Sequence, residues 1–340
     1  MKVVTLALQG GGSHGAFTWG VLDRLLEDDR LEIEGISGAS SGAVNAVVLA
    51  NGFTVGGRVG AREALRSLWE SVSSREPFTK IPDDLSAAAD IDSRTNRNVA
   101  LKMYLSLARF YSPYQLNPFN INPLRGILQD QLDFERLRTE CSIKLFVAAT
   151  QVSTGTLKLF RNKELTLDVI LASTCLPSVH QAIEIDGETY WDGGLTANPP
   201  ILPLLHECTK GDVVAVLLHP WRRPDNPKTA DDIWHRLTEI NFSSSFFTEL
   251  QGLALARREA SRSVFPFGRL ERRLRNLRTH VIDSQELMAG LSTMSKLNTN
   301  PAFIRALHEE GRNRAEIWLR DNFRLIGARS SFDLTRFLYW

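Results

Sequence analysis

The stretch that decides the fold runs Val3-Val4-Thr5-Leu6-Ala7-Leu8-Gln9-Gly10-Gly11-Gly12-Ser13-His14-Gly15. Residues 3–9 form a short apolar run rich in β-branched side chains and closed by glycines, which predicts a fully buried strand. Apolar residues then recur at helical spacing up to about Asp29: Ala16, Val21, Leu22, Leu25 and Leu26. The opening of the chain is therefore a strand, a tight glycine turn and a helix.

A second unit of the same kind follows directly. Residues 31–37 read as a strand, Gly38-Ala39-Ser40-Ser41-Gly42 as a tight turn, and residues 43–49 as a helix. Two such units in succession predict a parallel α/β sheet. Further predicted strands cover residues 144–152, 156–160 and 213–218, with a hairpin at 182–190 around Asp186-Gly187. Further predicted helices cover 61–72, 85–111, 167–173, 231–261 and 301–320.

Length and composition limit the class of protein. The 340 residues are 43% hydrophobic with a net charge of +1, which is ordinary for a globular chain and argues against a dedicated nucleic-acid binder. Cys141, Cys175 and Cys208 are far apart and follow no metal-binding or disulfide spacing. With no run of 18 apolar residues and no secretory leader, we expect a cytoplasmic protein without a metal site, which could still dock at a membrane or lipid surface.

The first glycine turn has two functional interpretations besides that of a purely structural strand-to-helix turn, which stays open. Gly10, Gly11 and Gly12, at the end of a strand and before a helix, can aim backbone N–H groups at a small anionic centre, as an oxyanion hole requires. A dinucleotide-binding fingerprint would instead need an acidic residue at the end of the second strand. Glu32 and Glu34 lie near that place, but the strand ends on a second glycine turn. The sequence therefore favours the oxyanion reading.

The second turn fits G-x-S-x-G, the nucleophile elbow, in which flanking Gly38 and Gly42 let the chain turn sharply and present one serine hydroxyl. The central serine of the pattern is Ser40. A serine hydroxyl needs a base to remove its proton. Asp192, followed by Gly193 and Gly194 after a predicted strand, is the candidate.

Together these motifs resemble the patatin-like phospholipases, acyl hydrolases that use a serine–aspartate dyad. That family carries a glycine-rich loop, then G-x-S-x-G, then D-G-G or D-G-A, and the chain matches them at 10–15, 38–42 and 192–194. Gly15 closes the matched glycine-rich loop, and supporting matches are Gly20 at the family's later glycine position, the run 172–177, and Asn198-Pro199-Pro200. The resemblance covers about residues 1–220.

The resemblance implies a three-layer α/β/α fold with a mainly parallel central sheet. It implies ester hydrolysis of phospholipids, lysophospholipids or related acyl lipids by Ser40 and Asp192, with no metal or cofactor. Residues 1–220 are then the catalytic domain. The resemblance assigns nothing to residues 221–340, but their long helical patterns predict a helical C-terminal extension packed on the same core. The family often carries Arg or Lys where this chain has His14, and more apolar residues where it has His180 and Gln181.

Other readings stay open at this stage. A Ser–His–Asp hydrolase shares G-x-S-x-G, and five histidines follow Asp192 in sequence: His206, His219, His235, His280 and His308. The segment Arg257–Arg278 contains eight arginines and only two glutamates. Such a basic run suggests a lipid-binding protein with weak or no hydrolase activity. Residues 110–123 read equally as a lid or a packed loop. Acylglycerol and polyester substrates, and any oligomeric state, are compatible with the same motifs.

Overall fold

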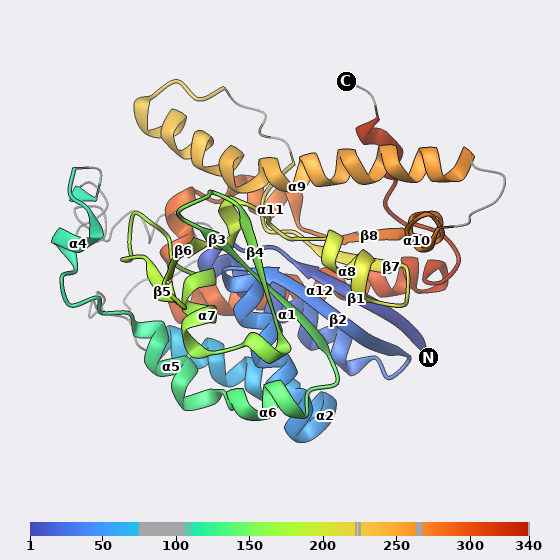
Figure 1. Ribbon diagram of the computed structural model, residues 1–340, viewed down its shortest axis with the longest axis horizontal. Helices are drawn as coiled ribbons and strands as arrows, with labels where there is room; N and C mark the ends of the chain where they lie inside the picture. The colour runs from blue at the N-terminus through green and yellow to red at the C-terminus, as the bar shows by residue number, and fades with distance from the viewer. Residues whose placement is uncertain (75–106, 109, 222, 224–225, 263–267, 339–340) are drawn as a thin grey trace.

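A computed structural model of the chain describes residues 1–74, 107–108, 110–221, 223, 226–262 and 268–338. Its centre is an eight-stranded sheet in the order β5-β6-β3-β2-β1-β7-β8, with β4 paired to β3 (Figure 1). The strands are β1 (Lys2–Leu8), β2 (Leu31–Ala39), β3 (Lys144–Gln151), β4 (Leu157–Arg161), β5 (Ile183–Ile185), β6 (Glu188–Asp192), β7 (Asp212–Val216) and β8 (Arg278–Ile282).

The sheet is mixed but mainly parallel. Strands β3, β2, β1, β7 and β8 run in one direction, whereas β4 and β6 are antiparallel to β3 and β5 is antiparallel to β6. The predicted hairpin at Asp186-Gly187 is present as β5–β6, and both turn residues have positive φ. The mainly parallel sheet expected from the sequence is confirmed.

The helices account for most of the remaining chain. Those of the first 220 residues are α1 (Gly15–Glu27), α2 (Ser41–Ser74), α4 (Pro113–Leu116), α5 (Pro123–Gln131), α6 (Phe134–Thr139), α7 (Leu167–Ser173) and α8 (Leu202–Glu207). The later ones are α9 (Ala230–Arg262), α10 (Arg269–Asn276), α11 (Gln285–Gly290) and α12 (Pro301–Asn322). Short 3-10 turns include η1 (Gly12–His14), η4 (Gly193–Leu195) and η5 (Thr293–Leu297).

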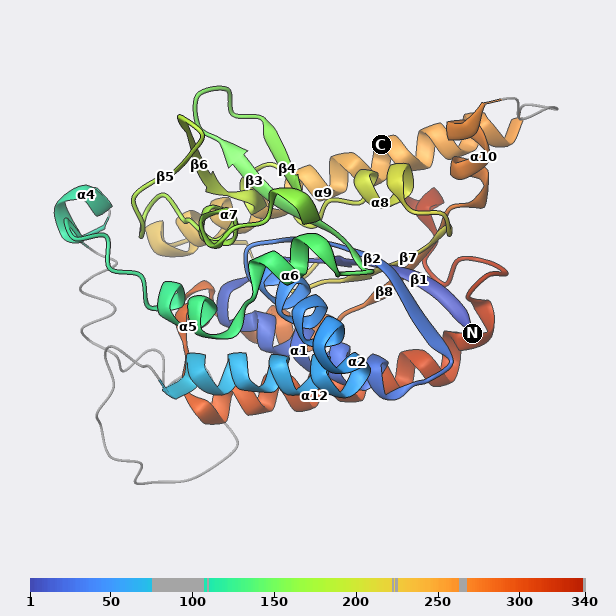
Figure 2. The same ribbon diagram turned by 60° about the horizontal axis from the view of Figure 1, so that its bottom comes forward.

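Helices cover both faces of the sheet and so make three layers. In Figure 2, α1, α2 and α12 lie on one side of the strands and α8, α9 and α10 on the other. Alternate residues of β7 enter two separate cores: Val214 packs with the α1–α2–α12 layer, and Val213 with the α8–α9 layer. This period of two is what a sheet buried on both faces requires.

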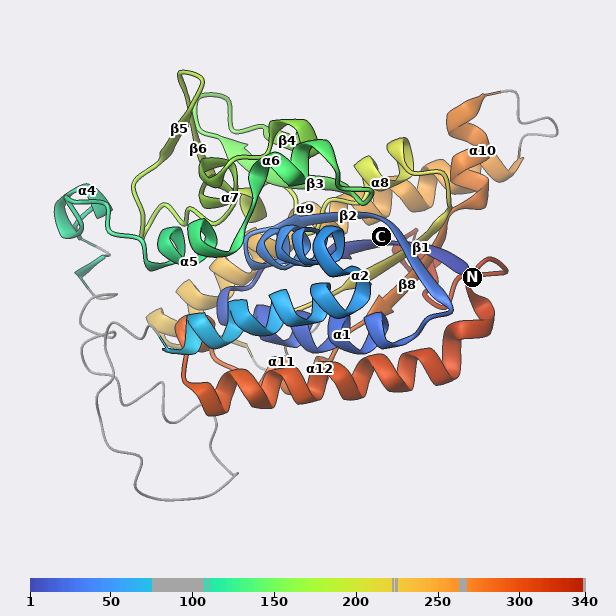
Figure 3. The ribbon, with the colours of Figure 1, turned by 90° about the horizontal axis from the view of Figure 1, so that it is seen from below.

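The C-terminal part of the chain is built into the same body. Helix α12 runs along α1 on the outer side of its layer (Figure 3). Arg312 of α12 bonds to Asp23 and Glu27 of α1, and Arg62 of α2 bonds to the same two carboxylates. The extension is mainly helical, as expected, but it also contributes β8, a strand that was not expected from the sequence.

Local differences from the sequence expectations have simple causes. The predicted helices at 43–49 and 61–72 are parts of α2, which is kinked where Gly56 and Gly57 leave helical geometry. The predicted helix at 85–111 lies almost wholly outside the described residues. Helices α5, α6, α8 and α10 are short and were missed. In the described part of the chain no helix combines the length and apolarity needed to span a membrane.

Candidate active site

The predicted nucleophile and base lie at the carboxyl edge of the sheet, on the two strands that flank β3. Ala39, the last residue of β2, pairs with Ala148 of β3, and Ser40 follows it. Asp192, the last residue of β6, pairs with the next residue of β3, Ala149, from the other side. The register therefore brings Ser40 and Asp192, 152 positions apart in sequence, to the same level of the sheet.

Ser40 occupies a sharp turn between β2 and α2. Its φ is 53°, a left-handed value that is uncommon for a non-glycine residue and costs energy at functional turns. The elbow closes tightly, because a Cβ added to Gly38 would lie 2.6 Å from the carbonyl carbon of Gly42. Small residues at both positions are therefore required for this turn, as the G-x-S-x-G pattern predicted.

The segment after α7 holds the backbones of both residues. The N–H of Ser40 donates to the carbonyl oxygen and the hydroxyl of Ser173, each at 3.1 Å. The N–H of Asp192 donates to the carbonyl oxygen of Cys175 at 2.8 Å. Residues 173–175 thus set the separation between the two predicted reacting groups, and this role explains why the run 172–177 accompanies the motifs.

Asp192 is fully buried, and burial raises the pKa of its carboxyl to about 7. Its Oδ1 accepts the N–H of Gly194 at 2.7 Å, which lowers the pKa in part. Its Oδ2 has no hydrogen bond of ideal geometry within the described chain, although the Ser40 hydroxyl lies near enough to lower the pKa of the carboxyl as well. Such loose contacts are common before a substrate binds.

The predicted oxyanion loop is only partly free to receive a ligand. The N–H of Gly10 donates to Asn198 Oδ1 at 2.6 Å, and the N–H of Gly11 donates to Ser41 Oγ at 3.0 Å. Of the three predicted donors, Gly12 is the one whose N–H has no acceptor within the described residues. The first N–H groups of a helical turn have no partner inside that turn, and Gly12 starts η1.

Asn198 links the glycine loop to neighbouring parts of the site. The sequence pattern Asn-Pro-Pro did not predict this role. Besides accepting from Gly10, its amide donates to the carbonyl of Phe242 on α9 at 3.1 Å. Gln9 donates to the Asn198 carbonyl at 3.0 Å and accepts the N–H groups of Leu218 and His219 after β7. These bonds fix the glycine loop against β7 and α9.

At the remaining motif glycines, other segments of the chain pack directly against the backbone near the carboxyl edge of the sheet. A Cβ on Gly15 would lie 2.8 Å from Ser41 Cβ, and one on Gly194 would lie 2.7 Å from the Phe242 ring. A Cβ on Gly193 would overlap the carbonyl oxygen of Ala148 on β3. The three motifs therefore meet around one point of the sheet edge.

The histidines of the rival triad do not form a base for Ser40 in the described chain. His280 bonds to Asp212 and Ser331, and His308 Nε2 lies 3.5 Å from a carboxylate oxygen of Asp23 without forming a hydrogen bond. His219 lies near the glycine loop but bonds to Ser243 and Lys296. His206 on α8 and His235 on α9 form no hydrogen bond with Ser40.

The described parts of the basic run, residues 257–262 and 268–278, lie away from these residues. Phe242 and Ser243 of α9 contact Gly194 and His219, whereas Arg257 is 15 residues further along α9, about 22 Å at the usual helical rise. Helix α10 leads into the amino end of β8, so it belongs to the opposite edge of the sheet (Figure 1).

An apolar stripe lies at the other end of α9. Ile233, Trp234, Leu237 and Ile240 precede Phe242 at helical spacing and are exposed, Trp234 by 58%. Figure 1 shows this end of α9 extending beyond the sheet on the side where α4 also projects.

Residues 110–123 carry several exposed aromatic rings. The exposed side chains of this stretch include Phe110, Tyr111, Tyr114 and Phe119. Gln181 fastens it to the β5 side of the sheet, because its amide donates to the carbonyl of Asn117 at 2.8 Å. The polar residue that departs from the resembled pattern therefore has a structural partner, while burial lowers the pKa of its neighbour His180.

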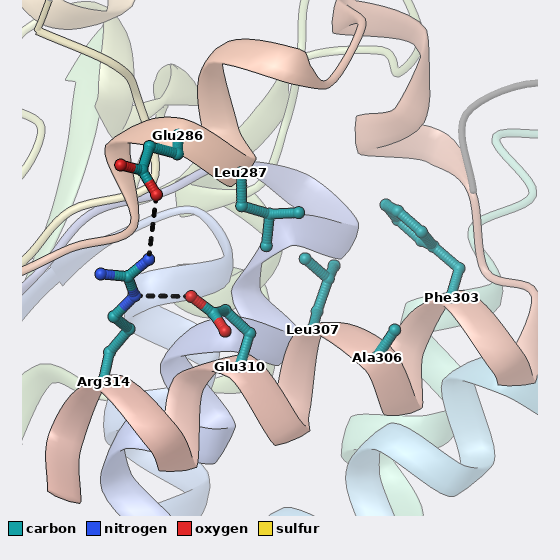
Figure 4. A pocket seen from close by; sticks show the side chains of 7 residues that line it. All are labelled: Glu286, Leu287, Phe303, Ala306, Leu307, Glu310 and Arg314. Carbon is teal, nitrogen blue, oxygen red and sulfur yellow. Dashed lines mark hydrogen bonds and ion pairs between the residues drawn. The ribbon is translucent and has the colours of Figure 1, made fainter. Parts of the chain in front are cut away.

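A hollow of about 300 Å³ opens between α11 and α12 (Figure 4). Leu287, Phe303 and Leu307 give it an apolar wall, and Arg314 pairs with Glu286 and Glu310 at its rim. Neither Ser40 nor Asp192 lines it, so it is separate from the candidate active site.

A mainly parallel sheet that is covered by helices on both faces, with a serine at a strand–helix turn, defines a three-layer α/β protein. The patatin-like phospholipase family model matches residues 6–205, and the chain belongs to this family. Lipid acyl hydrolysis is the activity of that family in general. Among solved structures, VipD from Legionella pneumophila is similar over 94% of this chain and 67% of its own, with 15% identity and a TM-score of 0.41. No curated protein matches the sequence.

Proposed function

We propose that the protein is a serine acyl hydrolase that cleaves ester bonds of phospholipids or related acyl lipids, with Ser40 as nucleophile and Asp192 as base. The observation that carries this is the register of β2, β3 and β6, which sets Ser40 and the buried Asp192 at one level on either side of β3. The Ser40 hydroxyl also lies near enough to Asp192 to lower the pKa of its carboxyl in part, which supports the pairing.

The proposed reaction has two steps. The Asp192 carboxylate takes the proton of Ser40 Oγ as this oxygen attacks the ester carbonyl carbon, and the carbonyl oxygen becomes an oxyanion near the Gly12 N–H. The tetrahedral intermediate then breaks its bond to the alcohol, which leaves with the proton from Asp192. Water next attacks the acyl-serine, again assisted by Asp192, and releases the fatty acid and the free enzyme.

The electrostatics of Asp192 suit this role. A general base works best when its pKa lies near the working pH. Burial without a full set of hydrogen bonds raises the pKa of Asp192 to about 7, so the carboxylate is both available at neutral pH and basic enough to accept a proton. We therefore expect the hydrolysis rate to fall below about pH 7, as Asp192 takes up its own proton.

A second candidate function, docking on a lipid surface, is favoured by the exposed stripe of α9. The stripe precedes the residues of α9 that touch the site, so a membrane or lipid droplet bound to it would lie near the carboxyl edge of the sheet. The basic run Arg257–Arg278 remains a proposed contact for anionic lipid, at the other end of the same helix. Docking through the stripe would bring lipid to Ser40, and docking through the basic run would not.

The decisive experiment compares the wild type with Ser40→Ala on a medium-chain p-nitrophenyl ester, with and without a chelator. Ser153→Ala serves as the matched control, because Ser153 is an exposed serine bonded to Glu188 on the β-hairpin side of the sheet. We expect the chelator and Ser153→Ala to leave the rate unchanged, and Ser40→Ala to abolish it with an unaltered circular dichroism spectrum. Equal rates in the wild type and Ser40→Ala would exclude Ser40 as nucleophile.

The substrate class needs a second comparison. Vesicles of phosphatidylcholine, micelles of lysophosphatidylcholine and an emulsion of triacylglycerol, each assayed for fatty acid release, separate the lipid classes. A dispersed aliphatic polyester tests the remaining ester. We expect release from phospholipid or lysophospholipid that depends on Ser40. Release from the neutral substrates alone would move the assignment to an acylglycerol or polyester hydrolase with the same dyad.

A further inference from the structure

The glycine loop carries a neutral side chain where a cation was to be expected. His14 is buried, and its Nε2–H donates to Ser295 Oγ at 2.7 Å, because the Ser295 hydroxyl itself donates to the Ser292 carbonyl. Its Nδ1 has no partner in the described chain. Burial, followed by the nearby Lys296, lowers the pKa of His14 to about 3. His14 therefore adds no charge to the loop at any physiological pH.

Lys296 of η5 lies directly against this loop. Its carbonyl oxygen packs on Gly12, whose φ of 59° and lack of a side chain make room for it. Its Nζ lies 2.9 Å from His219 Nε2. Since His219 Nδ1 bonds to Ser243 Oγ, Nε2 is the acceptor and the ammonium group is the donor. Lys296 is thus anchored at both its backbone and its charged end.

Two carboxylates, Glu239 and Asp192, lie near enough to act on the charge of the Lys296 ammonium group. Glu239 attracts it, but Glu239 already receives two bonds from Arg223, at 2.5 and 3.2 Å, and one from Arg236. Asp192 is the other carboxylate that acts on Lys296, and the two groups lie near enough that each moves the pKa of the other toward its charged form. One of the three ammonium N–H donors goes to His219.

We propose that Lys296, from the C-terminal part of the chain, supplies the positive charge that stabilises the oxyanion at the glycine loop, in place of a cation at position 14. The geometry that supports this is the place of the Lys296 ammonium group, 2.9 Å from Nε2 of His219, whose backbone N–H bonds to Gln9 next to the glycine loop. In addition, the N–H groups of Gly10 and Gly11 are already engaged by Asn198 and Ser41. With two of three predicted donors in use, a nearby cation carries more of the stabilisation.

This inference rests on the proposed hydrolase function and adds a supporting residue to it. Lys296 acts across the loop backbone and is not a catalytic residue itself. It also explains why the α/β core would need residues beyond 220 for its chemistry, since η5 lies in the extension.

A pH signature follows from the same contacts. Burial, opposed by Glu239, lowers the pKa of Lys296 to about 8, so its charge fades above that pH. His14 and His219 are neutral over this range, because burial lowers the pKa of both. The guanidinium group of Arg223 also lies nearby and helps to lower the pKa of Lys296. The rate should therefore rise with pH as Asp192 ionises near 7 and fall again as Lys296 loses its proton near 8.

The test compares Lys296→Met, Lys296→Arg and the control Lys144→Met on a p-nitrophenyl ester over about pH 5.5 to 9.5. Lys144 is a half-buried lysine whose Nζ lies 3.0 Å from Glu34 at the amino end of β3, so its loss removes a similar ion at the opposite edge of the sheet. We expect Lys296→Met to lower kcat about 10- to 100-fold, with KM changed by less than about threefold. The acid limb of its profile should move to higher pH, because Lys296 lowers the pKa of Asp192.

Lys296→Arg should restore part of the rate and move the alkaline limb upward, because arginine stays protonated in this range. Lys144→Met should keep the wild-type profile. A folded Lys296→Met with wild-type kcat and limbs would overturn the inference. The inference would also be overturned if Lys296→Met raised KM for phospholipid but left kcat for the p-nitrophenyl ester unchanged, since Lys296 would then bind a headgroup phosphate. If Lys296→Met does not fold, an unmoved alkaline limb in Lys296→Arg refutes the proposal.

Failure of the proposed function gives a different pattern. In that case Ser40→Ala hydrolyses the ester as fast as the wild type, and the inference about Lys296 falls with it. A Ser40-dependent rate that ignores Lys296 refutes the inference alone.

Discussion

Replacing Asp192 by asparagine should stabilise the protein at alkaline pH while removing its activity. An aspartate carboxyl ordinarily has a pKa of 3.8, whereas that of Asp192 is raised to about 7 in the fold, where burial is the main cause. The folded chain therefore holds a proton that the unfolded chain has already lost. By linkage, this stabilisation is complete below pH 3.8 and is lost as the pH rises through 7.

The magnitude follows from the two pKa values. At 1.36 kcal/mol per pKa unit the whole effect is about 4 kcal/mol, of which about 3 kcal/mol falls between pH 5 and pH 8. An asparagine side chain at this position would keep an oxygen to accept the Gly194 N–H and would have no charge to bury. When the pH is raised from 5 to 8, we expect the free energy of unfolding of Asp192→Asn to increase by about 1 to 3 kcal/mol relative to that of the wild type. Substitutions that remove an active-site charge often raise stability and lower activity in this way.

Urea unfolding followed by circular dichroism at both pH values measures this difference. Burial also raises the pKa of Glu249 to about 7, but Glu249 is present in both proteins, so the comparison isolates Asp192. Asp186→Asn is the matched control, because Asp186 is an exposed carboxylate in the β5–β6 turn with a left-handed φ that asparagine also adopts. If the stabilities of the wild type and Asp192→Asn changed equally with pH, the raised pKa of the buried Asp192 carboxyl would be refuted.

Three further outcomes are expected. Gly12→Ala should lower kcat at least about tenfold, because its φ is 59° and the new Cβ would overlap the Lys296 carbonyl; an active variant would contradict the tight loop. Ser173→Ala should change kcat by less than about threefold, because the Ser173 carbonyl still accepts the Ser40 N–H; a loss above about 30-fold would show that the hydroxyl itself is needed. Trp234→Asp should weaken sedimentation with neutral phosphatidylcholine vesicles, whereas Arg258→Gln should weaken it only with anionic vesicles; unchanged binding by Trp234→Asp would rule out the α9 stripe as the lipid contact.

Local patterns predicted the parts of the site that lie at strand ends. The turns at Gly10–Gly15 and Gly38–Gly42 are encoded by residues next to each other, because glycines must stand where the backbone closes on itself. That Ser40 and Asp192 follow strands on either side of β3 could not be read from the sequence. It depends on the strand order, which long-range pairing decides.

Lys296 and strand β8 were not predicted from the sequence, for the same reason. Lys296 meets Gly12 across more than 280 residues, and nothing in Ser295-Lys296-Leu297 differs from an ordinary surface turn. Strand β8 was missed because it carries Arg278 and His280, whose partner Asp212 is supplied by β7. Both features depend on partners that only the fold brings close.

The central claim, that Ser40 is a nucleophile activated by Asp192, is tested most directly by covalent labelling. The wild type, Ser40→Ala and Asp192→Asn are treated with an alkyl fluorophosphonate at about pH 8 and examined by intact-mass and peptide mass spectrometry. We expect one adduct on the wild type, located on Ser40, no adduct on Ser40→Ala, and labelling of Asp192→Asn slowed by at least about 100-fold. An adduct on another residue, or equal labelling of the wild type and Asp192→Asn, would contradict the dyad.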